Sequence, residues 1–168
     1  MSELRLAGII RESIVDGPGI RFVVFAQGCP HHCFECHNPD SWSFEGGFLA
    51  TPKQIIEEMS KNPLLKGLTL SGGEPFCQSA AMAELAQAAH DKGFDVITYT
   101  GFTFEELLEK SLSSAEVLNL LKNTDVLIDG PFIKEFKSYD LNFRGSYNQR
   151  IIDVKMSLKK GVAVLMHI

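Results

Sequence analysis

The stretch that decides the fold is GLTLSGGEPFCQSAAMAELAQAAHDKGFDVITYT, residues 67–100. Gly67–Ser71 is a short apolar run typical of a buried strand, and Phe94–Thr100 is rich in β-forming residues. Between them the pattern predicts a helix that begins at Ser79, carries an apolar stripe at helical spacing and stops at Gly93. A strand, a helix and a strand in this order indicate a parallel sheet with its helices outside.

The same alternation extends to both sides of this unit. Strands are predicted at Leu4–Arg11 and Arg21–Ala26, with a turn signal between them, and Gly28–Gly47 is predicted to be a long loop. Capping boxes open three more helices, at Thr51, Thr103 and Ser113. Further strands are predicted at Thr124–Asp129, Ile151–Met156 and Val162–His167. The whole pattern predicts an α/β fold and one domain over residues 1–168.

The composition is that of an ordinary globular protein, with 45% hydrophobic and 22% charged residues among 168. The formal net charge is −5 and no basic tract occurs, which argues against a nucleic-acid partner. No apolar run approaches the ~20 residues that span a bilayer, and the N-terminus does not resemble a signal peptide. We therefore expect a cytoplasmic protein without membrane contact.

Unusual residues follow several predicted strands at the end where parallel α/β sheets bind ligands. Cys29–Cys36 follows the strand that starts at Arg21, and Gly72-Gly73-Glu74-Pro75 follows the next strand. Thr100-Gly101 and Asp129-Gly130 follow the two strands after that. Their common location at one rim of the sheet predicts a single site.

The cysteines predict a metal centre. Cys29, Cys33 and Cys36 lie within eight residues of a predicted loop, whereas Cys77 stands alone. A 4Fe-4S cluster on three thiolates would leave one iron open to a substrate, since such clusters normally take four cysteines. Zinc is the alternative, with a neighbouring histidine as fourth ligand, and buried structural thiols are a third. The candidate histidines are His31, His32 and His37.

The chain resembles the glycyl-radical activases of the radical S-adenosylmethionine superfamily. Gly28–Pro39 is similar to the cluster loop of that superfamily, Asp16–Arg21 (DGPGIR) to the activase signature, and Ser71–Pro75 (SGGEP) to the methionine-binding segment. Later stretches resemble the branch that acts on anaerobic ribonucleoside-triphosphate reductase rather than on pyruvate formate-lyase. They are Tyr99–Phe102, Val126–Phe132 and Arg144–Gln149.

The resemblance implies two cofactors, a 4Fe-4S cluster on Cys29, Cys33 and Cys36, and S-adenosyl-L-methionine on its open iron. The reduced cluster would cleave the sulfonium to a 5′-deoxyadenosyl radical, which would take a hydrogen atom from a glycine Cα of the reductase. Reduced flavodoxin or ferredoxin would supply the electron. The architecture implied is a partial (β/α) barrel of mostly parallel strands, because the chain is too short for a full barrel of ~250 residues.

The resemblance also suggests roles for individual residues. The main chain of Gly72 and Gly73 would hold the methionine end of the cofactor, and Glu74 would also belong to the cofactor site. Valine at 73 would weaken cofactor binding while sparing the cluster. Main chain at Glu35, Cys36 and His37 would line the adenine. Thr100 and Asp129 would reach ribose or methionine, or else cap local backbone. Asp16 and Arg21 would shape the approach of the glycine loop, or else form a hairpin turn and a surface salt bridge.

Two other classes of protein stay open. A zinc-binding interaction module without catalysis would use the same cysteines but would give Asp16–Gly19 and Gly72–Pro75 no role. A radical enzyme acting on a small molecule, such as a deazaguanine-forming synthase, would not need the activase-type turn. An activase of pyruvate formate-lyase is the nearest alternative within the resemblance.

Overall fold

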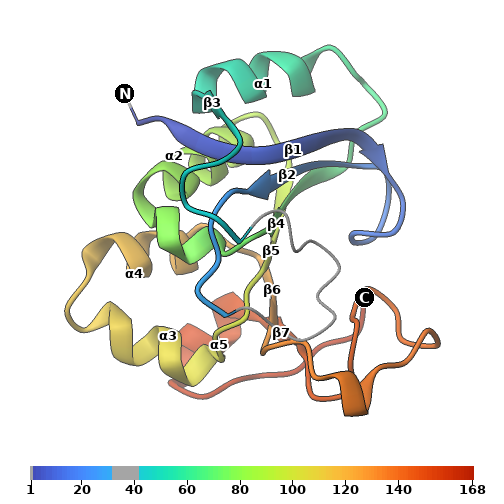
Figure 1. Cartoon of the computed structure of the whole chain (residues 1–168), viewed down its shortest axis with the longest axis vertical. Helices are drawn as coiled ribbons and strands as arrows, with labels where there is room; N and C mark the ends of the chain where they lie inside the picture. Colours follow the sequence, from blue (N-terminus) through green and yellow to red (C-terminus); the bar gives the residue numbers. More distant parts are fainter. Residues whose placement is uncertain (1, 32–41) are drawn as a thin grey trace.

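The computed structural model describes residues 2–31 and 42–168, whose strands form one seven-stranded sheet in the order β3-β1-β2-β4-β5-β6-β7 (Figure 1). Strands β2, β4, β5 and β6 run parallel to one another, while β1, β3 and β7 pair in antiparallel fashion. The sheet is open and ends at β3 and β7. The strands are β1 (Leu4–Ser13), β2 (Arg21–Ala26), β3 (Phe48–Ala50), β4 (Gly67–Gly72), β5 (Asp95–Tyr99), β6 (Val126–Asp129) and β7 (Arg150–Asp153).

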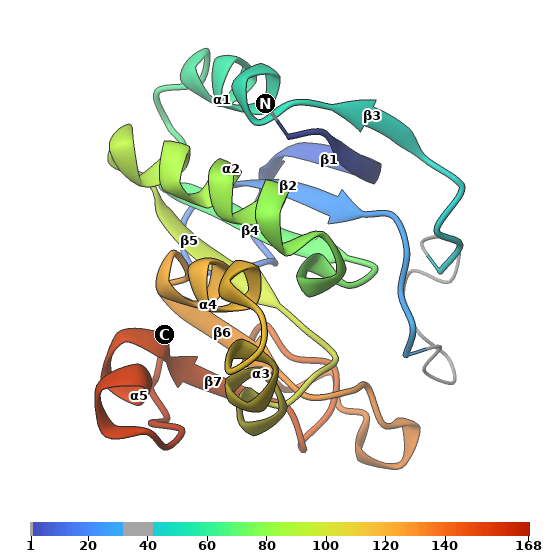
Figure 2. The same ribbon diagram turned by 90° about the vertical axis from the view of Figure 1, so that its left-hand side faces the viewer.

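Helices α1, α2, α4 and α3 pack side by side on one face of the sheet (Figures 1 and 2). Completely buried side chains of β4 and α2, among them Leu70 and Leu85, belong to the hydrophobic core between the layers. Helix α5 packs beside α4 and β7. The α-helices are α1 (Pro52–Ser60), α2 (Ser79–Asp91), α3 (Phe104–Ser111), α4 (Ala115–Lys122) and α5 (Val154–Lys160), and short 3₁₀ turns are η2 (Pro75–Gln78) and η3 (Lys134–Phe136).

Local signals account for the helix starts. The Thr51 hydroxyl accepts a bond from the Gln54 backbone N–H at 3.2 Å, and the Gln54 side chain accepts one from the Thr51 N–H at 2.9 Å. Thr103 and Glu106 form the same capping box at α3. Helix α4 begins one residue later than predicted, because Ser114 rather than Ser113 caps it.

The structure confirms an α/β fold with parallel strands and helices, and it corrects three details. The sheet is less parallel than predicted, since three of its six strand pairings are antiparallel and strands β1 and β7 run opposite to the other five. A strand over Ile151–Met156 is wrong beyond Asp153, whose carboxylate accepts the Met156 N–H at 3.0 Å and starts α5. A strand over Val162–His167 is also wrong, because only an isolated bridge between Leu165 and Ile152 forms there.

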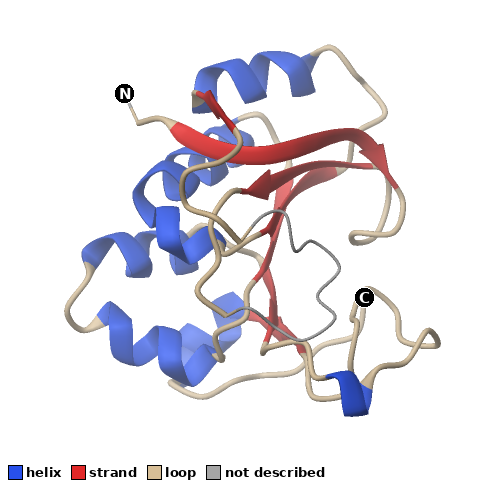
Figure 3. Ribbon diagram, viewed as in Figure 1, coloured by secondary structure: helices blue, strands red, loops and turns tan. Residues whose placement is uncertain are grey.

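The opposite face of the sheet carries the β1–β2 turn and the long segment 131–149 instead of a helical layer (Figure 3). The candidate site is therefore sought on this loop-covered face.

Of the helices in the described ranges, none combines the length and the apolar character that crossing a bilayer requires.

Candidate functional site

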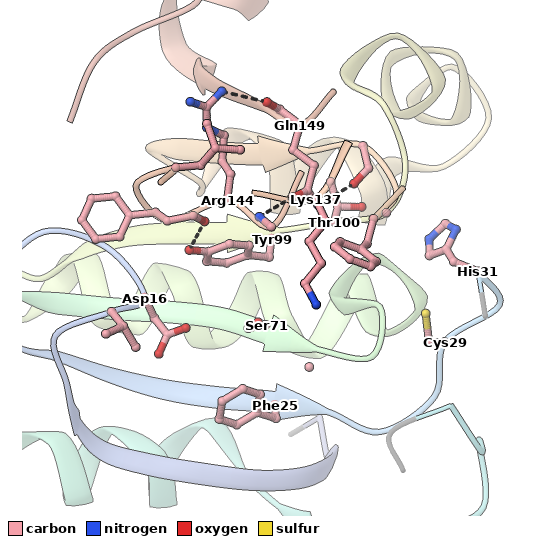
Figure 4. A pocket seen from close by; sticks show the side chains of 18 of the residues that line it. Asp16, Phe25, Cys29, His31, Ser71, Tyr99, Thr100, Lys137, Arg144 and Gln149 are labelled. Carbon is pink, nitrogen blue, oxygen red and sulfur yellow. Dashed lines mark hydrogen bonds between the residues drawn. The ribbon is translucent and has the colours of Figure 1, made fainter. Parts of the chain in front are cut away.

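A cavity of about 630 Å³ opens at the carboxyl ends of the parallel strands (Figure 4). Phe25 of β2, Ser71 of β4 and Tyr99 of β5 line the sheet side of this cavity. Asp16 of the β1–β2 turn and the segment 131–149 line it from above the sheet. Its size is in the range of cavities that enclose a small molecule, and its location is the one predicted for the site.

The structure separates the predicted site residues into three groups. Those that line the cavity are Asp16, Cys29, Gly72, Gly73 and Thr100. Those whose side chains are completely buried outside the cavity lining are Arg21, Glu74 and Asp129. Those that lie outside the described residues are Cys33, Glu35, Cys36 and His37, together with His32.

Cys29 stands at one end of the cavity, in the loop that leaves β2 (Figure 4). Its side chain is buried, and its N–H donates to the Trp42 carbonyl at 3.1 Å, which ties the loop to the chain beyond residue 41. Within residues 2–31 and 42–168, no three His, Cys, Asp or Glu side chains gather in a metal-binding group. A buried thiol facing the cavity, with two further cysteines in the same loop, is a donor set that fits an iron–sulfur cluster.

Gly72 and Gly73 bring the end of β4 against the start of the cysteine loop. Gly72 has φ +94°, a conformation that side chains disfavour, and the Gly73 N–H donates to the Ala26 carbonyl at 2.7 Å. The next N–H, of Glu74, donates to the Gly28 carbonyl at 2.8 Å. A Cβ on Gly73 would overlap the Gly28 carbonyl. Glycine here is required by the approach of two backbones, and it leaves main chain open to the cavity.

The side chains of Thr100 and Asp129 are bonded within the protein. The Thr100 hydroxyl donates to Glu74 Oε2 at 2.8 Å and accepts the Phe102 N–H at 3.1 Å. Asp129 accepts the Phe104 N–H at the start of α3 at 2.7 Å and pairs with Arg150. Each side chain thus accepts a backbone N–H, as the capping alternative for both residues requires.

Arg21 is a buried residue, in contrast to the surface salt bridge that the sequence suggested. Its guanidinium donates to Thr69 Oγ1 and to the Leu68 carbonyl, both at 2.8 Å, and pairs with Asp95. It also donates to the Pro18 carbonyl at 3.2 Å, which anchors the turn that carries Asp16. Arg21 thus contacts the turn rather than the cavity.

Cys77 is an exposed residue at η2 and does not line the cavity. Desolvation of its thiol and the negative charges of Glu74 and Cys29 raise its pKa to about 11. Cys77 thus does not share the cavity with Cys29.

The segment 131–149 supplies much of the cavity lining, although none of its residues was predicted to belong to the site. The Tyr99 hydroxyl donates to the Phe143 carbonyl at 2.7 Å, and Phe143 is the single non-glycine residue with positive φ (+62°) in the described ranges. Gln149 Oε1 accepts the Gly145 N–H at 2.8 Å. The motifs that begin at Tyr99 and Arg144 were the available signal, since they contain the donor of the first bond and both partners of the second.

We expect Tyr99→Phe to destabilise the protein by ~0.5–1.5 kcal/mol, the usual contribution of one hydrogen bond. Burial, followed by the charge of Asp16, raises the Tyr99 pKa, so the phenol keeps its proton and donates throughout the neutral range. Urea unfolding measures the change, with Tyr147→Phe as the control because Tyr147 is 61% exposed. Equal stability of the two variants would show that the Phe143 bond contributes nothing.

Comparison with known proteins places these features in a class. A family described as "4Fe-4S single cluster domain" matches residues 15–152, which contain the cysteine loop and most of the sheet. Fold, cysteine loop and match together define an iron–sulfur protein with a single 4Fe-4S cluster domain.

Curated relatives refine this class. A Vibrio cholerae protein is 36% identical over 148 residues, 82% of this chain and 90% of its own. A Haemophilus influenzae protein is 34% identical over 85% of this chain and 94% of its own, and an Escherichia coli protein 33% identical over 81% and 90%. All three are named "Anaerobic ribonucleoside-triphosphate reductase-activating protein". The chain belongs to this family of activating proteins, as the resemblance predicted.

Proposed function

We propose that this protein is a radical S-adenosylmethionine activase that generates a glycyl radical on anaerobic ribonucleoside-triphosphate reductase. The observation that carries the proposal is the cavity, where Cys29 and the glycine pair 72–73 meet in a chain of the reductase-activating family. The names of the relatives support the reductase as partner. The proposal treats residues 1–168 as one catalytic domain.

The cysteines Cys29, Cys33 and Cys36 would hold the 4Fe-4S cluster at the end of the cavity where Cys29 lies. Main chain of Gly72 and Gly73 lines the same cavity, and a backbone without side chains suits close contact with the methionine end of S-adenosylmethionine. Main chain at Glu35, Cys36 and His37 is proposed to line the adenine. Glu74, Thr100 and Asp129 would support these contacts from behind, since their side chains are bonded to protein atoms.

When bound, the cluster would supply the one-electron chemistry that reductively cleaves S-adenosylmethionine, and the cleaved cofactor would remove a hydrogen atom from the glycine Cα. Reduced flavodoxin or ferredoxin is proposed as the donor of that electron. The chain itself would surround the reacting groups, with Phe25 and Tyr99 on the sheet side and the segment 131–149 above.

The glycine loop of the reductase is proposed to approach at the turn that carries Asp16. Asp16 lines the cavity at some distance from Cys29 (Figure 4), and its carbonyl accepts the Thr69 hydroxyl at 2.8 Å. Arg21 would assist by holding the Pro18 carbonyl of the same turn. A rigid turn at the rim lowers the ordering cost of receiving a flexible loop.

Electron paramagnetic resonance on the reductase tests the proposal. After anaerobic incubation with this protein, reductant and S-adenosylmethionine, we expect a glycyl doublet on the reductase and none on a variant with that glycine replaced by alanine. 5′-Deoxyadenosine should form in the same mixture. A radical that appears on pyruvate formate-lyase but not on the reductase would refute the choice of partner, and absence of 5′-deoxyadenosine would refute the chemistry.

A further inference from the structure

The Glu74 carboxylate is completely buried at the meeting point of three loops. Oε1 accepts the Gly101 N–H at 2.8 Å and lies 2.6 Å from His31 Nε2. Oε2 accepts the Thr100 hydroxyl at 2.8 Å and the Phe76 N–H at 3.2 Å. A buried carboxylate must have hydrogen-bond partners, and here protein groups supply them to both oxygens. The Glu74 carboxylate therefore needs no ligand to be stable in the folded protein.

His31 brings the cysteine loop to this carboxylate. It lies two residues after Cys29, and both side chains stand at the same end of the cavity (Figure 4). Its ring packs edge-on against Phe102 with centroids 4.5 Å apart and covers Gly101 so closely that a Cβ there would overlap the imidazole. The described start of the loop is thus held by side-chain contacts to the ends of both β4 and β5.

We infer that the Glu74–His31 pair positions the cluster-binding loop, and that Glu74 acts on the site through His31 instead of touching the cofactor. The inference rests on the proposed function. Backbone bonds fix the loop at Gly28 and Cys29, and His31 extends this attachment two residues further along the loop. Outer partners of this kind orient metal ligands without binding the metal themselves. His31 is therefore a positioning residue for the cluster.

The zinc alternative gave His31 a different role, that of a metal ligand. A ligand and a positioning residue differ in what can replace them. Glutamine at 31 has an amide that can donate to Glu74 Oε1 but is a poor ligand for iron. Rescue by His31→Gln thus indicates positioning, whereas equal loss in His31→Gln and His31→Ala indicates ligation.

The experiment compares His31→Ala, His31→Gln and His90→Ala as anaerobically reconstituted proteins. His90 is the matched control, because its Nε2 lies 2.7 Å from Asp125 Oδ2 in a similar pair away from the cavity. The measurements are iron content, the rate of iron transfer to a chelator, and the paramagnetic resonance spectrum of the reduced cluster with and without S-adenosylmethionine. Circular dichroism checks that each variant is folded.

We expect His31→Ala to acquire iron but to lose it about tenfold faster than wild type, in line with the loss of an outer partner of a metal ligand. Its spectrum should respond less to S-adenosylmethionine, while His31→Gln recovers most of both properties and His90→Ala matches wild type. If His31→Ala behaves like wild type, the inference is overturned. It is also overturned if both His31 variants contain as little iron as Cys29→Ala. A wild-type protein that binds no cluster overturns the proposed function itself.

Discussion

Cys29→Ala, Cys33→Ala and Cys36→Ala are each expected to abolish stable cluster binding, whereas Cys77→Ala leaves it intact. An iron–sulfur cluster normally takes four thiolates, and this chain offers three in one loop, so removal of one leaves too few. We expect iron retention to fall by at least ~tenfold. Loss of a residue that only hydrogen-bonds to a metal ligand already costs about this much affinity, and these variants lose the ligand itself. Iron and sulfide analysis after anaerobic reconstitution measures this, with 5′-deoxyadenosine formation as a second readout.

Cys77→Ala is the matched control for these variants. Cys77 is exposed and does not line the cavity that contains Cys29, so we expect its loss to leave the cluster in place. If Cys77→Ala lost as much iron as Cys33→Ala, the assignment of three ligands would be wrong.

The central part of the fold was predictable because its signals are local. The sequence of β4 and β5 has the apolar pattern of buried strands, and that of α2 has an apolar stripe at helical spacing. Thr51 and Thr103 are N-cap residues that mark the starts of α1 and α3. The direction of β1 relative to β2 was also predictable. Its turn to β2 is too short for the crossover that parallel strands need, so an antiparallel pair had to form.

The C-terminal part was mispredicted because short apolar runs do not distinguish strand from helix. Val154 and Ser157 are both buried and three residues apart, which is helical spacing. Asp153 as the N-cap and Gly161, with φ +74° at the C-cap, were signals for α5 that the sequence analysis did not use.

The location of the site at the ends of the parallel strands was predictable, but the hydrogen-bond partners of its side chains were not. Glu74 was assigned to the cofactor, yet its bonds reach residues 26 and 43 positions away in the chain, at Thr100 and His31. Asp129 likewise pairs with Arg150, 21 residues on. Such pairs depend on which strands become neighbours, and that is a property of the folded sheet rather than of any local motif.

Gly73→Ala is expected to impair the cluster and S-adenosylmethionine binding together. The sequence alone suggested that a larger residue at 73 would spare the cluster. The structure changes this expectation, because the new Cβ would overlap the Gly28 carbonyl of the cysteine loop and lie 2.9 Å from the Ala26 carbonyl. Both atoms are backbone, so the loop must move, and overpacking of this kind costs ~1–3 kcal/mol of stability.

Gly8→Ala is the control for the Gly73 variant, since a Cβ at Gly8 would have no atom within 4 Å. We expect Gly73→Ala to retain iron several-fold less well than Gly8→Ala under a chelator and to bind S-adenosylmethionine at least ~tenfold more weakly, a difference of about 1.4 kcal/mol. Anaerobic equilibrium dialysis and iron analysis measure the two effects on the same samples. Loss of cofactor affinity with full iron retention would show that Gly73 serves the cofactor alone, and that the cysteine loop tolerates displacement at Gly28.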